Sequence, residues 1–265
     1  VTQTSVGRLF MAGVIPGILL TMMMMLAIFI VTRKMDIEYF PKASFREVLR
    51  TGKEALWGLM LIIIIMGGIY AGIFTPTEAA AVAAVYAFVV VVFIYQDLKL
   101  SEIPKVLTES AKLTVTLMFI IANAYVFAFV LTTEQIPQTA AEMILSSGLS
   151  PWMFLLVVNL LLLVAGNFID PTSVILIVVP IIFPIAMKLG IDPIHLGIIL
   201  VINMEIGLVT PPVGLNLFVT SGVTGLTLVE MIHAALPWLL LLLTALMLIT
   251  YVPIISTFLP DMVFN

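Results

Sequence analysis

The sequence predicts an all-α, polytopic membrane protein whose apolar helices are interrupted at two places. Hydrophobic residues make up 62% of the 265 residues and charged residues only 10%, and the mean hydropathy is +1.26. A soluble domain carries about 25% charged residues, so this chain has no room for a sizeable soluble domain. Polar residues and prolines interrupt the apolar pattern at 166–173 and 207–214. Breaks of this kind within the membrane are typical of secondary transporters.

The composition also argues against several kinds of site. The chain has no cysteine and two histidines, so we expect no disulfide, no thiolate metal site and no histidine metal centre. It contains no GxxxxGK[ST] phosphate loop, which argues against ATP use by this chain. We find no Ser–Lys, Asp–Asp or HExxH arrangement on the spans and therefore expect no enzyme. The lipid bilayer is an expected partner, and nucleic acid is not.

The first half of the chain predicts four membrane spans and two short polar helices. The spans are predicted at 9–31, 55–74, 75–95 and 113–131. Pro16-Gly17 is expected to kink the first span, and the TPTE motif at 75–78 is a capping box that opens the third. The SFRE motif that begins at Ser44 is a similar box, expected to open an amphipathic helix over 44–54 in the membrane interface. A second polar helix is expected over 97–112.

The segment 150–188 predicts a helical hairpin with a polar tip. An apolar arm runs from Ser150 to Gly166, and a second follows over 174–188. Each arm has about 15 to 17 residues, whereas a full crossing takes about 20. We therefore expect a re-entrant hairpin with its tip buried in the membrane. Two full spans are the alternative.

The next apolar segment, 193–222, is predicted to be broken at Thr210-Pro211-Pro212. Two prolines cannot continue a helix, because each lacks an N–H and its ring crowds the preceding turn. They can begin one, so Thr210 is expected to be the N-cap of a second half-helix, with Pro211 at its first position. A proline kink packed between helices is the alternative.

The basic residues predict the orientation. Six of the eleven fall in 33–54 and three in 97–112, whereas 133–149 contains none. The positive-inside rule places the first two segments in the cytoplasm, and 133–149 and the C-terminus then lie outside. A short amphipathic helix with Glu230 and a last span at 237–259 complete the layout. The charges are compatible with the re-entrant hairpin and with two full spans.

The chemistry of the interruptions predicts an ion and substrate site. Asp170 is typical of an N-cap, but an ionisable group inside a membrane is costly and is usually functional. Backbone carbonyls at an unwound helix end are hard oxygen ligands for sodium, and the N–H groups of the next half-helix favour an anion. Glu205 faces either this cavity or a structural partner. We expect His195 to be interfacial and Asn123 to form an interhelical hydrogen bond.

Five motifs occur in a fixed order along the chain. They are GRLFMAGVIPG, GGIYAGIFTPTEAAAVA, GNFIDPTS, the PI…P…GIDP run and NMEIGLVTPPVGLNLF. Together they resemble the large membrane (M) subunit of TRAP transporters, the tripartite ATP-independent periplasmic carriers. The resemblance implies an ion-transporter-superfamily elevator fold with inverted repeats, each with a re-entrant hairpin and a discontinuous helix. It also implies Na⁺-coupled symport of a small organic acid across the bacterial inner membrane. A C4-dicarboxylate is favoured, and sialic acid or another sugar or keto acid is possible.

The resemblance also implies partners and site residues. The partners are a small four-helix membrane (Q-type) subunit and a periplasmic substrate-binding protein. The implied substrate residues are Asn167, Asp170, Thr172, Ser173, Thr210, Pro211, Pro212 and Asn216. The implied Na⁺ ligands are Gly166, Asn167, Asp170, Asn203, Gly207, Val209, Thr210 and Gly214. The family has a first hairpin before the GRLFMAGVIPG motif, so the chain is expected to be the C-terminal portion of such a subunit.

The expected organisation follows from these elements. It comprises a first transmembrane helix with its arm helix (1–54), scaffold helices with a second arm helix (55–149), a transport unit (150–223; hairpin 150–188, broken helix 193–222) and an amphipathic helix with the last span (224–265). The transport unit is expected to move as an elevator against the scaffold. A binding-protein-independent antiporter or symporter of the same superfamily is the alternative, and a channel or a scaffold subunit is a third class.

Overall fold

A computed structural model describes the chain except for residues 1, 3, 34–42, 147, 213 and 265, and within the described residues every regular element is a helix. Six stretches are long and apolar enough to cross a membrane: Val6–Thr32, Phe45–Tyr70, Pro76–Ile94, Leu100–Thr133, Pro171–Lys188 and Leu228–Tyr251. The prediction of an all-α, polytopic membrane protein is therefore confirmed. The helices divide into two compact units, Val1–Lys34 with Met118–Asn265, and Met35–Leu117.

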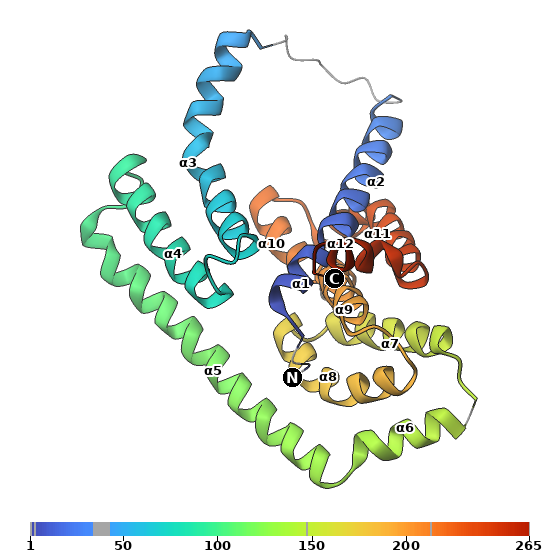
Figure 1. Ribbon diagram of the computed structural model, residues 1–265. Coiled ribbons are helices and arrows are strands. Elements are labelled where there is room, and N and C mark those ends of the chain that lie inside the picture. Colours follow the sequence, from blue (N-terminus) through green and yellow to red (C-terminus); the bar gives the residue numbers. More distant parts are fainter. Residues whose placement is uncertain (1, 3, 34–42, 147, 213, 265) are drawn as a thin grey trace. The chain divides into compact units, whose positions relative to one another are not determined.

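The larger unit contains both predicted interruptions. Its helices are α1 (Val6–Ala12), α2 (Val14–Thr32), the second half of α5 (Ile103–Thr133), α6 (Ile136–Ser146), α7 (Pro151–Gly166), α8 (Pro171–Lys188), α9 (Pro193–Gly207), α10 (Leu215–Thr224), α11 (Leu228–Tyr251) and α12 (Ile254–Phe264). The core of this unit is formed by apolar side chains of α7, α8, α9 and α11. Most of α9 is buried, with α7 packed along it (Figure 1).

The smaller unit is built around a helical hairpin, in which α3 (Phe45–Tyr70) and α4 (Pro76–Val89) pack against each other. It also contains a π-helical turn (Val90–Ile94), a 3₁₀ turn (Leu100–Glu102) and the first half of α5. The predicted capping box of α4 is present: Glu78 N–H donates to the Thr75 hydroxyl, and the Glu78 carboxylate accepts from Thr75 N–H. Two tyrosine hydroxyls, of Tyr86 and Tyr95, donate to backbone carbonyls of α3.

Three predicted helix boundaries are wrong because polarity changes without a backbone break. The polar helix over 44–54 and the following span form one helix, α3, since Gly52 and Gly58 weaken a helix without ending it. The polar segment 103–112 likewise continues into α5. In addition, the region 133–149, for which no helix is predicted, contains α6. The predicted amphipathic helix near Glu230 continues through Pro237 into α11.

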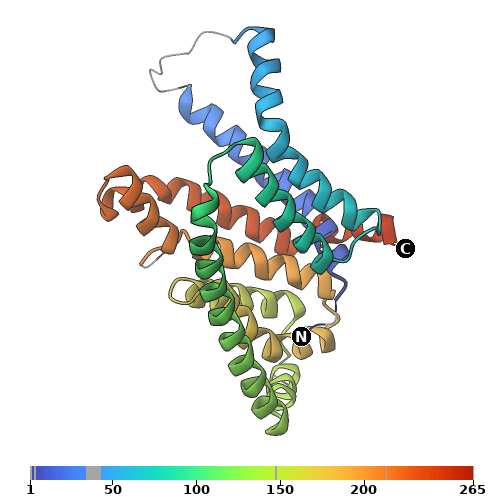
Figure 2. The same ribbon diagram turned by 90° about the vertical axis from the view of Figure 1, so that its left-hand side faces the viewer.

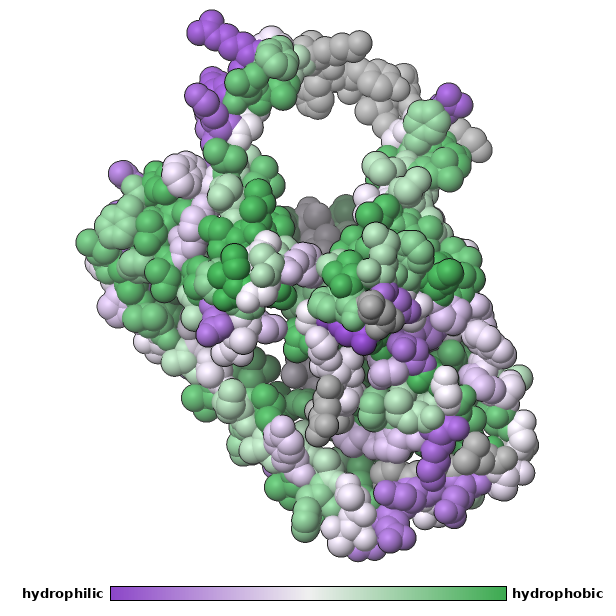
Figure 3. Space-filling view, viewed as in Figure 1, coloured by the Kyte–Doolittle hydropathy of each residue, from purple (hydrophilic) through white to green (hydrophobic). Residues whose placement is uncertain are grey.

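The first span breaks earlier than predicted. Pro16-Gly17 was expected to be the kink, but α1 ends at Ala12 and α2 begins after Gly13. The ring of a proline crowds the residue four positions before it, so Pro16 fits the first turn of α2 and displaces the break upstream. Beyond the break, α2 exposes apolar side chains such as Met22 and Leu26. The surface over α2 is largely hydrophobic (Figure 3). This is the surface expected of a helix that faces lipid.

Candidate functional site

The two interruptions meet at a backbone contact between Gly166, at the end of α7, and Gly207, at the end of α9. A Cβ atom on Gly207 would lie 2.9 Å from the Cα atom of Gly166, so the contact requires glycine. Beside it, the Asn167 side-chain amide donates from Nδ2 to the Pro211 carbonyl oxygen at 3.3 Å. Residues 166–173 and 207–214 therefore form one site, which we call the tip–break site.

At the tip, Asp170 acts as the N-cap of α8, as predicted. Its Oδ1 accepts from the Ser173 N–H at 3.0 Å, and its Oδ2 accepts from the Ser173 hydroxyl at 2.5 Å. Pro171 occupies the first helical position. Thr172 is exposed beside them. Because the Asp170 carboxylate already occupies the start of α8, an added anion is not expected to bind at those N–H groups.

At the break, the predicted role of Thr210 as an N-cap is wrong. Its hydroxyl donates to the Ile206 carbonyl at 2.6 Å, so Thr210 closes the end of α9 instead of opening the next half-helix. The second half-helix, α10, begins at Leu215 after Gly214, which has φ +48° and no capping side chain. Pro211 is partly buried and Pro212 exposed. Several residues of irregular backbone thus separate the two half-helices.

Two of the predicted residues point away from the tip. Asn216 and Val209 line a cavity of about 410 Å³ between α9, α10 and α2, together with Glu205. No residue of the hairpin lines this cavity. Glu205 is exposed there and forms no ion pair with the described part of the chain, so its side chain faces the cavity and not a structural partner. The backbone N–H of Asn216 donates to the Leu208 carbonyl at 3.0 Å and ties α10 to the end of α9.

Two side-chain oxygens near the Gly166–Gly207 contact are buried with no hydrogen-bond partner among the described residues. They are Asn167 Oδ1 and Asn203 Oδ1. Asn203 lies one helical turn before Gly207 and is 0% exposed. Buried carbonyl oxygens are normally paired, so an unpaired one requires an explanation such as an ion or a water molecule. Amide oxygens are suitable ligands for a hard cation.

The sequence reasoning missed a buried polar network behind the site. The side chains of Asn159 (α7), Asn203 (α9) and Thr250 (α11) are joined by hydrogen bonds, and each is 0% exposed. The signal was present, because Asn159 interrupts an otherwise apolar arm of the hairpin. Among the described residues, no interhelical bond of Asn123 is found where one was predicted. Its amide donates within its own helix, to the Phe119 carbonyl.

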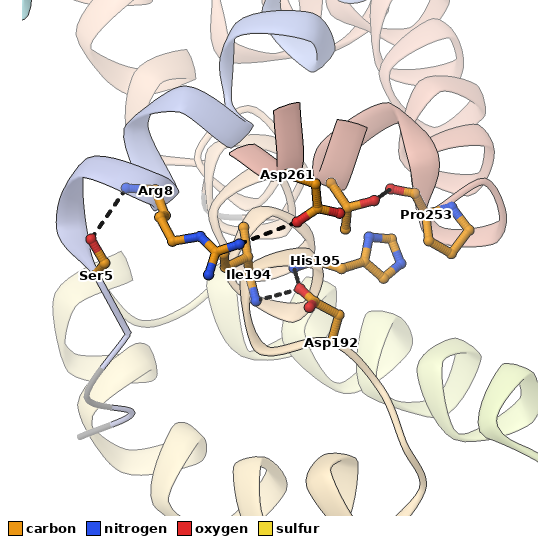
Figure 4. A network of polar contacts seen from close by, with 8 residues as sticks. Ser5, Arg8, Asp192, Ile194, His195, Pro253 and Asp261 are labelled. Atoms are coloured by element: carbon orange, nitrogen blue, oxygen red, sulfur yellow. Dashed lines mark hydrogen bonds and ion pairs between the residues drawn. The ribbon is translucent and has the colours of Figure 1, made fainter. Parts of the chain in front are cut away.

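His195 is buried within the protein and is not interfacial. It is 2% exposed, its Nδ1 lies 2.7 Å from the Ser256 hydroxyl, and its Nε2 lies 3.2 Å from the Thr250 carbonyl. Asp192 caps α9 just before it, by accepting from the N–H groups of Ile194 and His195 (Figure 4). These contacts fix the first turn of α9 against α11 and α12.

Comparison with protein families identifies the group to which this architecture belongs. Residues 1–255 match the model of the DctM component of the tripartite ATP-independent periplasmic transporters. The chain belongs to this family. The resemblance inferred from the five sequence motifs is therefore confirmed, and the six apolar helices of the described residues agree with a multi-pass membrane protein.

Relatives within the DctM family are similar along almost the whole chain. The chain is 64% identical over 260 residues to the C4-dicarboxylate TRAP transporter large permease protein DctM of Pseudomonas aeruginosa, covering 98% of this chain and 61% of the relative. The corresponding protein of Rhodobacter capsulatus is 52% identical over 99% of this chain and 60% of its own length. The sialic acid TRAP transporter large permease protein SiaM of Vibrio cholerae is 37% identical, over 99% of this chain and 61% of its own length. The chain thus spans about three-fifths of the length of these relatives.

Proposed function

We propose that this chain is part of a Na⁺-coupled symporter that takes up a small organic acid, with a C4-dicarboxylate as the favoured substrate. The relatives at 64% and 52% identity carry the C4-dicarboxylate name, whereas the sialic acid relative is 37% identical. We further propose two partners, a small membrane subunit and a periplasmic substrate-binding protein that delivers the acid. Tripartite ATP-independent periplasmic transport, the description of the family, supports both.

The observation that carries the proposal is the meeting of the two interruptions. The Gly166–Gly207 contact and the bond from Asn167 to the Pro211 carbonyl bring irregular backbone from two apolar helices to one point. In a membrane, such backbone is tolerated where it is buried in protein or lines a cavity for solute. Discontinuous helices that meet in this way are how many secondary transporters hold ions and substrates.

The charge distribution supports coupling to a cation. Lys188 is the only Lys or Arg between residues 150 and 224, so it is the only basic side chain of this segment that could balance the charge of a carboxylate. An unpaired anion in a poorly hydrated site is costly. The unpaired oxygens of Asn167 and Asn203 fit a hard monovalent cation, which would supply positive charge beside the substrate. Bound Na⁺ would then raise the affinity for the acid, which is the differential binding that coupling requires.

An elevator is the proposed movement. The hairpin and the broken helix (α7 to α10) belong to one compact unit together with α1, α2, α11 and α12, so the moving body would include those helices as well. Phe168 at the tip is 63% exposed, and the chain has no cysteine of its own. A single cysteine at Phe168 should react with a membrane-impermeant thiol reagent from one side without substrate and should be protected when Na⁺ and succinate are added. Equal labelling under both conditions would argue against the movement.

The principal test is uptake of succinate by the full-length permease with its partners in proteoliposomes. Asn167→Ala is expected to weaken the Na⁺ dependence of uptake, because it removes both the bond to Pro211 and the unpaired oxygen. Gln138→Ala is the control, since it removes an exposed side-chain amide on α6, outside the tip–break site. Unchanged Na⁺ dependence in Asn167→Ala would discard the site. Uptake that needs no binding protein would instead favour the alternative, a binding-protein-independent carrier of the same superfamily.

A further inference from the structure

Every fully buried polar side chain in the described part of the chain belongs to one group behind the tip–break site. The members are Asn159, His195, Asn203, Thr250 and Ser256, each at most 2% exposed. They come from α7, α9, α11 and α12. The group has two halves. In one, the Ser256 hydroxyl bonds to the His195 ring. In the other, side-chain hydrogen bonds join Thr250 to Asn159 and Asn159 to Asn203.

The hydrogen bonds of Asn203 fix which way its amide group faces. Its Nδ2 donates both to Asn159 Oδ1 at 2.7 Å and to the Ile199 carbonyl at 2.8 Å. Both partners are acceptors, so turning the amide over would place its oxygen against two other oxygens. Both donor hydrogens are used, and Oδ1 is left buried without a partner among the described residues.

Asn159 is itself held in one orientation. Its Nδ2 donates to the Thr250 hydroxyl oxygen at 3.0 Å, which leaves its Oδ1 to accept from Asn203. Donation thus runs in a single direction, from Asn203 through Asn159 to the Thr250 hydroxyl. Its effect is to keep one carbonyl oxygen of α9 unpaired, one helical turn before the Gly207 contact.

We propose that Asn159 and Thr250 are positioning residues that hold the Asn203 oxygen open as a Na⁺ ligand. This inference rests on the proposed Na⁺ coupling. It assigns a supporting role in Na⁺ binding to two further residues, Asn159 and Thr250. Neither residue is expected to touch the ion. Outer contacts of this kind commonly orient a metal ligand, and their loss typically lowers affinity about 10- to 100-fold. Leaving a buried oxygen unpaired is unfavourable by itself, so an arrangement that enforces it indicates a ligand.

The test is a Na⁺ titration of the full-length permease followed by its thermal unfolding midpoint, with K⁺ replacing Na⁺ at constant ionic strength. Asn159→Ala should shift the Na⁺ concentration at half-effect upward by about tenfold or more. Thr250→Val, which keeps the side-chain shape and removes the acceptor, should shift it in the same direction by a smaller factor. Ser256→Ala is the matched control: it removes a buried bond at the far end of the group and should lower the midpoint without changing the Na⁺ dependence.

A double variant separates positioning from direct binding. Asn203→Ala removes the proposed ligand, so adding Asn159→Ala to it should cause no further loss of Na⁺ affinity. If Asn159→Ala and Thr250→Val both keep the Na⁺ dependence of the wild type, the inference is overturned. The Asn203 Oδ1 would then be the partner of a buried water molecule and not of Na⁺. If the wild-type protein itself shows no Na⁺-specific shift, the proposed coupling fails first and this inference fails with it.

Discussion

The two interruptions of the tip–break site begin their second helices in opposite ways. At the tip, α8 starts with a side-chain cap, Asp170 on Ser173, and a proline at its first position. At the break, α10 starts at Gly214 with left-handed backbone and no side-chain cap. Its position is set by backbone bonds such as that from Asn216 N–H to the Leu208 carbonyl. The start of α8 is therefore held by a side-chain cap, whereas the start of α10 is held by backbone hydrogen bonds.

The largest effect that this comparison predicts is at Gly214. Alanine there combines an unfavourable φ of +48° with a Cβ atom 2.9 Å from the Thr210 carbonyl oxygen. The expected loss is about 2 to 4 kcal/mol in the free energy of unfolding, measured by thermal or denaturant unfolding in detergent. Gly225→Ala is the control, because Gly225 has φ +74° but no atom within 4 Å of the added Cβ. Equal losses at the two positions would show that the close approach contributes nothing.

Gly207→Ala should be next in size. The new Cβ meets the backbone of Gly166, which cannot rotate away as a side chain would. We expect the free energy of unfolding to fall by about 1 to 3 kcal/mol. The tip and the break should also move apart, which would impair uptake. Gly222→Ala, in the open surroundings of α10, should leave both quantities unchanged or slightly raise stability. Normal uptake in Gly207→Ala would mean that transport does not need the backbone contact.

The tip should respond to the loss of its cap. Asp170→Ala removes both bonds to Ser173 and should cost about 1 to 2 kcal/mol of stability. Asp170→Asn keeps a good capping residue while removing the charge, so it should retain most of the stability. Comparing Na⁺-dependent uptake in the two variants separates capping from charge. If both variants transport like the wild type, Asp170 is a cap and nothing more.

The smallest effect is expected at Thr210. Valine keeps the shape but loses the hydroxyl that donates to the Ile206 carbonyl, with an expected cost of about 0.5 to 1 kcal/mol. Thr244→Val in α11 breaks the same kind of bond, to the Leu240 carbonyl, within an unbroken helix. That control should cost less, because the Leu240 carbonyl keeps a full helical bond, whereas the Ile206 carbonyl keeps the turn bond from the Val209 N–H at 3.1 Å. An equal cost would show that the end of α9 does not depend on the hydroxyl.

Much of the fold was predictable because it depends on local chemistry. Pro171 and Pro193 mark the starts of α8 and α9, and Asp170 and Asp192 cap them as their sequence context indicates. Hydropathy gave the spans, but it misplaced the boundary at 54–55, where side chains change from polar to apolar while the backbone continues as α3. A helix ends where its hydrogen bonds end, which composition does not report.

The candidate site was only partly predictable. The sequence located both interruptions, but the Gly166–Gly207 contact depends on how α7 and α9 pack, which no local pattern specifies. Thr210 was misassigned because its hydroxyl can bond forward as a cap or backward to Ile206, and the backward bond is the one formed. Asn159 was overlooked because one amide in an apolar arm gives no sign of its partners on α9 and α11.

The length of α3 has a mechanical consequence. Its 26 residues span about 39 Å, whereas the hydrocarbon core of a bilayer is about 30 Å thick. Its first three turns carry Arg46, Glu47, Arg50 and Lys53, and this charged end and the apolar span belong to one helix (Figure 2). A tilt of the membrane-embedded part of α3 is therefore expected to move its charged end outside the bilayer. A fluorophore at Lys53 would register that tilt from the aqueous phase.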